Sequence, residues 1–374
     1  MNRQPGLDLL RAIAIVWVML FHSFLVGGLG PQFGWLSRFG WAGVDIFFVL
    51  SGFLIGSQLL RPLQRGERVS LAKFYERRAW RILPAFAVVL ALYSAIPSLR
   101  EVPGMQPWWQ FATFTVNLLI DYERHPAFSH AWSLCVEEHF YLLFPLLAVA
   151  MSRRASPRAV VALGVGVLLG GTVLRGAVWL HDTTLDTGRN WFIEDLYDPT
   201  WMRLDGLLAG VMLATVRVYR PQWWSRWQSR AGSFALGGLA LTACALWLFR
   251  DRTGLAANTV GWPLLSTGFA CLLVAASTAQ WLQGRWWMRP LSWIATISYS
   301  LYLVHKIAYH LVQVHVAPLL GDAGGLRFAA YGLGALAAGA LLHYAVERPF
   351  LRWRDRRTAG DHPARWRRQA ATGI

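Results

Sequence analysis

Charge and cysteine are both scarce in this sequence, and their scarcity excludes several classes of protein. Only 15% of the 374 residues are charged and 55% are hydrophobic, whereas a soluble domain carries about 25% charged residues. The three cysteines lie inside apolar segments without metal-ligand spacing, so neither a disulfide framework nor a metal site is indicated. An apolar composition arranged in long runs is typical of a membrane protein.

Other common features are missing as well. The sequence contains no internal repeat, no low-complexity linker and no added soluble domain. The first apolar run lacks a cleavage-site pattern, so we expect a retained first helix rather than a signal peptide. These absences predict one integral membrane domain over residues 1–350, followed by a basic cytoplasmic tail over residues 351–374.

The net charge of +16 could suggest a nucleic-acid partner. The arginines, however, stand between the apolar runs, and many of the 21 tryptophans cluster near the ends of those runs. Positive charge in short loops and aromatic rings at the interface are topology features of membrane proteins. We therefore expect membrane lipid, and no nucleic acid, around this chain.

Hydropathy predicts an all-α bundle of about ten transmembrane helices, because each span needs about 20 mostly apolar residues. We place these spans at residues 7–29, 41–60, 83–99, 133–151, 159–180, 201–217, 232–249, 257–281, 291–313 and 327–347. Arginine and lysine concentrate in alternate loops and in the tail, which by the positive-inside rule puts both termini in the cytoplasm. The apolar stretch 108–120 is too short to cross, and we expect an interfacial or re-entrant helix there.

The first predicted span contains two ionisable residues, Arg11 and His22. Eleven residues at 100° per residue leave the two side chains within about 20° of each other and roughly 16 Å apart along the helix. Ionisable groups inside a span are costly and are functional candidates by default. A neutral imidazole at His22 can act as a general base towards a hydroxyl. The alternative is a packed histidine that bonds to a neighbouring helix.

The fourth predicted span begins with two adjacent carboxylates, Glu137 and Glu138. Acidic residues contribute little to topology, so they indicate another role. Ser133, Glu137 and Tyr141 share one helix face, and a carboxylate there could orient and stabilise the His22 imidazole. The alternative is a first helical turn in which acids interact favourably with the helix dipole.

A row of basic residues follows the second predicted span. Lys73, Arg77 and Arg81 recur every four residues, with Arg78 beside them, and guanidinium groups suit the binding of phosphates. The alternative is contact with lipid head groups.

Further polar residues lie inside other predicted spans. Asp45 precedes Gly52 and Gly56 on one face of the second span, where small residues permit close approach of a thin ligand or, as we expect for the glycines, of another helix. Arg203 and Asp205 could pair with residues of other spans. The ninth span carries a polar stripe that faces either the bundle interior or a cavity, and its members are Ser298, Tyr302, His305 and Tyr309.

A bundle with a polar core and a basic cytoplasmic mouth fits either an enzyme or a transporter. A transporter more often shows inverted repeats and helices that are broken by glycine or proline in matching halves. Neither is present, which favours an enzyme. The alternative is a membrane carrier or flippase for a lipid-linked sugar.

Seven motifs occur in an order that resembles the acyltransferase-3 family of integral membrane acyltransferases. They run through nearly the whole chain: LDLLRAIA at residues 7–14 leading to His22, GVDIFFVLSGFLI at 43–55, FYERRAWRILP at 74–84, WSLCVEEHFYLLFP at 132–145, RLDGLLAG at 203–210, SYSLYLVH at 298–305 and VERP at 346–349. Each is weak alone, but seven in order are specific. Cys135-Val136 and His139 are small departures from the pattern.

The resemblance implies a ten-helix fold that transfers an acyl group from acyl-coenzyme A to a hydroxyl, usually of a carbohydrate, without a metal. It implies that His22 is the central catalytic residue and that Arg11 assists the donor or the histidine. Arg77, Arg78 and Arg81 are then the contacts for the phosphates of coenzyme A. Catalytic roles of Glu137 and Glu138, and substrate contacts of Asp45, Arg203, Tyr302 and His305, are less defined in the family.

The resemblance also implies a cellular setting. Acetyl is the group most frequent in the family, so we expect acetyl-coenzyme A as the donor. The composition, rich in Ala, Arg and Trp, indicates a high-GC bacterium, and hence an inner-membrane enzyme that acts on a surface polysaccharide or a lipid-linked oligosaccharide. Some family members carry a fused extracytoplasmic transferase domain. We expect this chain either to acylate its acceptor directly or to hand over to a separate glycan-assembly or extracytoplasmic partner.

Overall fold

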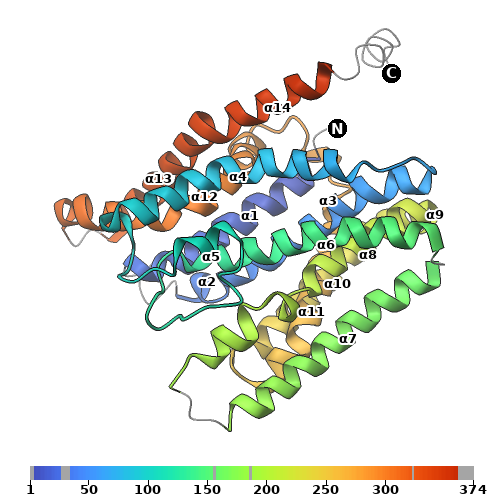
Figure 1. Ribbon diagram of the computed structural model, residues 1–374, viewed down its shortest axis with the longest axis horizontal. Helices are drawn as coiled ribbons and strands as arrows, with labels where there is room; N and C mark the ends of the chain where they lie inside the picture. Colours follow the sequence, from blue (N-terminus) through green and yellow to red (C-terminus); the bar gives the residue numbers. More distant parts are fainter. Residues whose placement is uncertain (1–3, 27–33, 155–156, 185–187, 322–323, 361–374) are drawn as a thin grey trace.

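The computed structural model describes residues 4–26, 34–154, 157–184, 188–321 and 324–360, and within these ranges the chain is helical without a β-strand (Figure 1). The helices are α1 (Pro5–His22), α2 (Gly34–Arg38), α3 (Gly43–Gln64), α4 (Leu71–Ala95), α5 (Trp108–Ala112), α6 (Trp132–Arg154), α7 (Pro157–Asp182), α8 (Asp205–Tyr219), α9 (Pro221–Ser229), α10 (Ala231–Leu248), α11 (Trp262–Ala276), α12 (Met288–His315), α13 (Gly324–Leu342) and α14 (Arg348–Gly360). The all-α class predicted from the sequence is confirmed.

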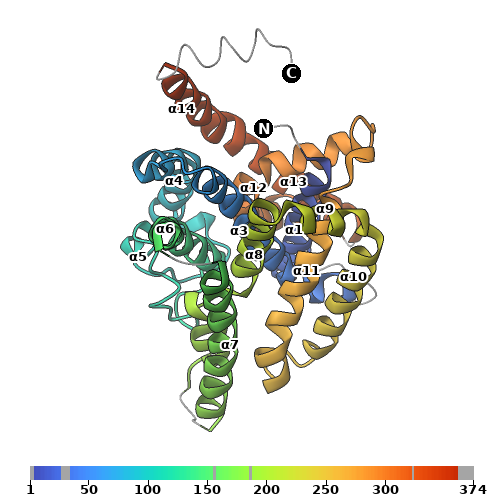
Figure 2. The same ribbon diagram turned by 90° about the vertical axis from the view of Figure 1, so that its right-hand side faces the viewer.

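Helix α1 occupies the centre of the bundle, where it packs against α3, α11 and α12. The pairs α3 with α8, α10 with α11 and α12 with α13 build the walls around it. Helix α7 extends away from the bundle (Figure 2), and its surface is mostly exposed. The polar groups near α1 therefore lie deepest in the fold.

Eight helical segments among the described residues are long and apolar enough to cross a membrane. All ten predicted spans are helical over most of their length, although residues 27–29 of the first lie outside the described part. The predicted spans 201–217 and 291–313 are not among the eight segments that are long and apolar enough, for different reasons. Helix α8 has only 15 residues, whereas α12 has 28 but carries a polar stripe that lowers its hydropathy.

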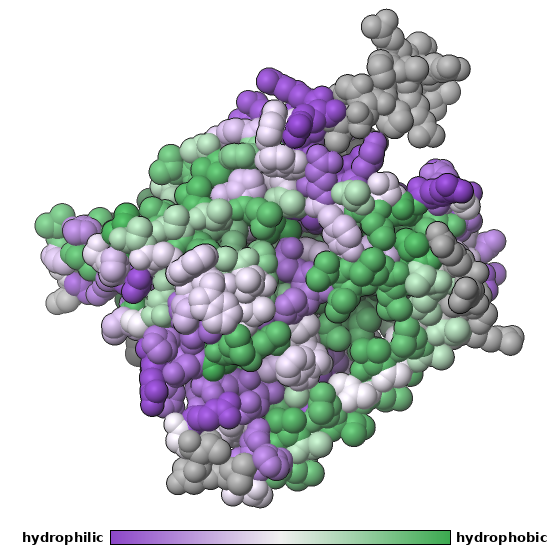
Figure 3. Space-filling model, in the orientation of Figure 1, coloured by the Kyte–Doolittle hydropathy of each residue, from purple (hydrophilic) through white to green (hydrophobic). Residues whose placement is uncertain are grey.

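The surface is suited to lipid. In Figure 3 apolar residues cover a broad band of the molecule, with polar residues gathered around α14 at the top and over the loops at the lower left. Large side chains such as Val173, Leu236 and Leu341 are each more than two-thirds exposed. An apolar belt between two polar ends is the arrangement that a bilayer requires.

Two local predictions agree with the structure. The four-residue spacing of the basic row is helical, as predicted, and α4 begins at Leu71 and carries both the row and the third predicted span on one helix. The stretch 108–120 forms only the five-residue helix α5 and does not cross, as predicted.

Helix α14 extends past residue 350 and packs on α4, where Trp80 contacts Trp353 at 4.5 Å between ring centroids. Residues 361–374 of the predicted tail lie outside the described part.

Glycines allow α3 and α8 to pack with their backbones almost in contact. A Cβ atom on Gly52 would overlap the carbonyl oxygen of Leu207, and one on Gly210 would overlap that of Val49. Small residues at crossing points are a common device of helices in membranes. The close packing that the sequence predicted for Gly52 and Gly56 is confirmed, with α8 as the partner.

We expect Gly210→Val to destabilise the protein, because the added atoms have no room beside Val49 and overpacking costs about 1–3 kcal/mol or more. Gly237→Ala in α10 is the matched control, since a Cβ there meets nothing within 4 Å and alanine has the higher helix propensity. Thermal unfolding in detergent measures both. Equal melting temperatures for Gly210→Val and the wild type would contradict the packing argument.

Candidate active site

A cavity opens between α1, α3, α4, α6 and α12. Its walls combine arginine and glutamate side chains with aromatic and aliphatic ones. The lining residues are Arg11, Val44, Phe47, Phe48, Leu50, Ser51, Leu54, Ile55, Arg78, Arg81, Ile82, Ser133, Leu134, Glu137, Glu138, Tyr141, Ser298, Tyr299 and Tyr302. Five of the motifs singled out in the sequence thus converge on one space.

Three arginines give the cavity its positive charge. Arg11 reaches it from α1 and lies 3.8 Å from Asp8, while Arg78 and Arg81 reach it from α4. The Arg78 guanidinium lies 5.0 Å from the ring centroid of Tyr141, a cation–π distance. Of the three predicted phosphate contacts, Arg77 is exposed and does not line the cavity, because its position on α4 turns it away from α6.

The two glutamates also line the cavity, but their partners differ from the prediction. Ser51 donates a hydrogen bond to Glu137 Oε1 at 2.7 Å, and Tyr141 donates to Oε2 at 2.9 Å. The prediction that Glu137 or Glu138 orients His22 is wrong, since the ring of His22 bonds to another histidine. Glu137 instead fixes α3 against α6.

Three histidines form a cluster, called here the histidine cluster, from separate parts of the chain: His22 ends α1, His130 precedes α6 and His305 lies in α12. His22 Nδ1 is 2.9 Å from His305 Nε2. The ring centroid of His130 lies 5.0 Å from that of His305 and 6.1 Å from that of His22. His130 and His305 are buried, and His22 is partly buried.

The hydrogen bonds define the protonation pattern of the neutral rings. His305 Nδ1 lies 2.8 Å from the carbonyl oxygen of Tyr302, which can only accept, so Nδ1 carries the proton. His305 Nε2 then has a lone pair and accepts from His22 Nδ1–H. This leaves a lone pair on His22 Nε2, the form that a general base or nucleophile requires.

Tyr302 and Ser133 connect the cavity with the histidine cluster. Both line the cavity. Tyr302 donates to the carbonyl oxygen of His130 at 2.8 Å and accepts from Ser133 at 2.6 Å. His22 itself does not line the cavity in the described part of the chain. The predicted stripe of α12 is confirmed, with Tyr302 and Ser298 on the cavity, His305 on His22, and Tyr309 donating to Met19 of α1.

A buried ion pair supports the cluster from the side of the loops. Lys306 lies 3.3 Å from Glu101 and donates to Ser129 at 3.0 Å. Glu101 also accepts from Tyr93 at 2.9 Å. The pair therefore ties α12 to the two connections that contain Glu101 and Ser129, next to the histidine cluster.

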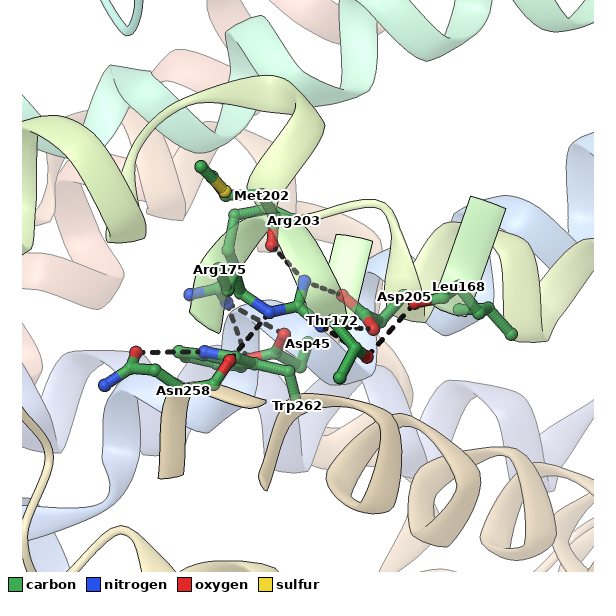
Figure 4. A network of polar contacts seen from close by, with 9 residues as sticks. All are labelled: Asp45, Leu168, Thr172, Arg175, Met202, Arg203, Asp205, Asn258 and Trp262. Atoms are coloured by element: carbon green, nitrogen blue, oxygen red, sulfur yellow. Dashed lines mark hydrogen bonds and ion pairs between the residues drawn. The ribbon is translucent and has the colours of Figure 1, made fainter. Parts of the chain in front are cut away.

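Asp45 and Arg203 lie away from the cavity, in a separate network (Figure 4). Arg203 Nη2 contacts both oxygens of Asp45, at 2.8 and 3.0 Å, and the guanidinium lies 3.7 Å from the ring centroid of Trp262. The pairing that the sequence predicted for Arg203 is confirmed. Such pairs stabilise a bundle because each charge would otherwise be buried without a partner.

Arg175 completes the network and was missed from the sequence. It donates to Asp205 at 2.8 Å, to the Met202 carbonyl at 2.8 Å and to the Asn258 carbonyl at 2.8 Å. Its position inside the fifth predicted span was a usable signal, because an arginine there needs an internal partner.

Two further charged residues were also missed, in connections outside the membrane-spanning helices. Burial raises the pKa of Asp198 well above its ordinary value and lowers the pKa of Arg252. The Arg252 guanidinium lies 4.5 Å from the ring centroid of Tyr197 and 5.0 Å from that of Trp41. Asp198 is buried and Arg252 is partly buried. The Arg252 guanidinium also lies 5.6 Å from the ring centroid of Phe21, the neighbour of His22 at the end of α1.

A family model described as an acyltransferase domain matches residues 4–344. The match covers the cavity, the histidine cluster and the charged network together. The chain belongs to the acyltransferase-3 family. A comparison with solved structures finds no significant match.

Relatives of this acyltransferase-3 protein carry a more specific description. The O-acetyltransferase OatA of Staphylococcus aureus strain NCTC 8325 is 32% identical over 226 residues, which is 57% of this chain and 34% of the relative. A protein of S. aureus strain MSSA476, whose name assigns O-acetyltransferase activity provisionally, is 32% identical over 231 residues, 57% of this chain and 35% of its own length. The match thus spans about a third of the length of these relatives.

We expect the acceptor function of His305 to matter more than its bulk. In His305→Gln the amide oxygen can replace Nε2 and accept from His22, whereas His305→Leu removes the acceptor and frees the other tautomer of His22. Acyltransferase activity should therefore fall by about 10²-fold or more in His305→Leu, with partial rescue in His305→Gln. Equal activity of the two variants would contradict the assigned tautomer.

Proposed function

We propose that this membrane acyltransferase is an O-acetyltransferase that moves an acetyl group from acetyl-coenzyme A to a hydroxyl of a cell-surface or exported polysaccharide or oligosaccharide. The observation that supports this most directly is that Tyr302 and Ser133, which line the three-arginine cavity, are hydrogen-bonded to each other and to the backbone of His130 in the histidine cluster. The names of the S. aureus relatives favour acetyl as the group.

The cavity suits a donor that is anionic at one end and thin at the other. Arg11, Arg78 and Arg81 provide guanidinium groups for phosphates. Phe47, Phe48 and Leu54 provide an apolar passage for the pantetheine arm. If the ten spans and the cytoplasmic termini hold, the arginines of α4 face the cytoplasm, the compartment that supplies coenzyme A thioesters.

The chemistry needs one basic imidazole at the thioester. His22 Nε2 has the lone pair, and His305 holds the ring through Nδ1. His22 either accepts the acyl group itself or takes the hydroxyl proton. In both cases the carbon–sulfur bond breaks, a carbon–oxygen bond to the acceptor forms, and the hydroxyl proton ends on the coenzyme A thiol. Glu137 and Glu138 take part as walls of the donor cavity, not as partners of His22.

We expect His22→Ala to lose at least about 10²–10⁴-fold in transferase activity, the usual contribution of an acid–base group. Purified protein in proteoliposomes, incubated with radiolabelled acetyl-coenzyme A, measures exchange or transfer of the label. His181→Ala is the control, because its side chain is 72% exposed at the end of α7. Full activity of His22→Ala would refute the mechanism, and a wild type inert towards acetyl-coenzyme A that moves a lipid-linked sugar would favour a carrier.

Two neighbouring arginines on α4 provide a matched test of donor binding. Arg78 lines the cavity and Arg77 is exposed. A hydrogen bond to a charged group contributes about 1.5–3 kcal/mol, so Arg78→Ala should weaken acetyl-coenzyme A binding by about 10-fold or more, whereas Arg77→Ala should leave it nearly unchanged. The KM for acetyl-coenzyme A, measured for both variants and the wild type, gives the difference. A larger effect for Arg77→Ala would place the phosphates on the outer face of α4.

A further inference from the structure

His130 is held in the histidine cluster by an unusual piece of backbone. Phe128, two residues before it, has a left-handed conformation with φ of 58°, which costs a bulky residue about 1–2 kcal/mol. The ring of Phe128 is fully buried and stacks on Tyr93 at 4.4 Å and on Phe111 at 5.2 Å, while its N–H donates to Glu101. These contacts offset the strain, and strained residues of this kind concentrate at functional sites.

The turn that follows places two side chains. Ser129 accepts from Lys306 at 3.0 Å, and His130 enters the bundle next to α12. His130 Nε2 lies 3.3 Å from the carbonyl oxygen of Leu303, which can only accept, so Nε2 carries the proton. His130 is 2% exposed, and its Nδ1 keeps a lone pair.

That lone pair has no hydrogen-bond partner among the described residues. A buried acceptor without a partner costs about 1–3 kcal/mol. A purely structural histidine would gain from pairing Nδ1, and the nearby Tyr302 hydroxyl is used on the backbone carbonyl of His130 instead. The arrangement leaves Nδ1 available for a donor that the chain itself does not provide.

The histidine cluster therefore contains two imidazoles with free lone pairs, His22 Nε2 and His130 Nδ1. The third ring, His305, is hydrogen-bonded to His22 and packs against His130. We propose that His130 is a second catalytic residue, the base that takes the proton of the acceptor hydroxyl, while His22 acts on the acyl donor. This inference rests on the proposed O-acetyltransferase function and assigns the two halves of the reaction to different rings.

The step balances without another reactant. The acceptor oxygen bonds to the acyl carbon as its proton passes to His130 Nδ1. The bond from that carbon to its leaving group, either the thiolate of coenzyme A or His22 Nε2, then breaks. The proton returns from His130 to the thiolate or to solvent. Lys306, at the other side of Ser129, opposes a lasting positive charge on His130 and so favours return of the proton.

Two nucleophiles separate this role from a structural one. A sugar hydroxyl needs a base to lose its proton, whereas hydroxylamine is a strong nucleophile at neutral pH and needs none. His130→Gln keeps an amide N–H for the Leu303 carbonyl and lacks a basic nitrogen. Membranes of the source cells, with the gene replaced by each variant, contain the native acceptor. These membranes are incubated with radiolabelled acetyl-coenzyme A, and ester formation is measured as alkali-labile label in the glycan fraction. In a parallel reaction with added hydroxylamine, labelled acetylhydroxamate is measured.

We expect His130→Gln to lose about 10²–10⁴-fold of the ester formation and to keep hydroxamate formation close to the wild-type level. His22→Ala should lose both. Retention of both activities in His130→Gln would overturn the proposal, and so would loss of both with an unchanged melting temperature. If His130→Gln does not fold, His130→Asn is measured by the same criteria. A wild type that forms neither product from acetyl-coenzyme A would refute the proposed function itself.

Discussion

Two imidazole rings, one from the last residue of α1 and one from the middle of α12, share a hydrogen bond deep in a largely apolar bundle. Neither ring could be left unpaired there at low cost, because an unsatisfied buried polar group is penalised heavily. The bond removes one N–H from the apolar surroundings and fixes a lone pair on His22 Nε2. Tyr302 and His130 are positioned around this pair, and the donor cavity ends beside them.

The charged residues of the bundle fall into two groups with different roles. Arg203 with Asp45 and Arg175 with Asp205 are buried and paired with one another, so they fix helices α3, α7 and α8 together. The arginines that line the cavity face open space, and N–H groups of theirs remain available to a ligand. The buried arginines that are paired with carboxylates therefore hold helices together, whereas the arginines that line the cavity are available to a ligand.

Helix α4 couples the donor site to the rest of the fold. Because the basic row and the third span are one helix, Arg78 and Arg81 are held at a fixed position relative to the bundle instead of on a loop. Contacts from α14 to Trp80 and from Ile82 to Tyr299 of α12 support this helix on two sides. A rigid wall suits the proposed site, in which a long, thin donor has to reach one ring.

The sequence by itself determined the helical class, the approximate limits of most helices, the stripe of α12 and the candidate role of His22, because these depend on periodicity and on the cost of ionisable groups in lipid. Only the tertiary structure decided the partners. It assigned His305 to His22 in place of a glutamate, turned Arg77 away from the cavity and added His130 and Arg175. Such pairings join residues of different helices, 30 positions apart for Arg175 and Asp205 and 283 for His22 and His305, and helical periodicity contains no information on which faces of different helices meet.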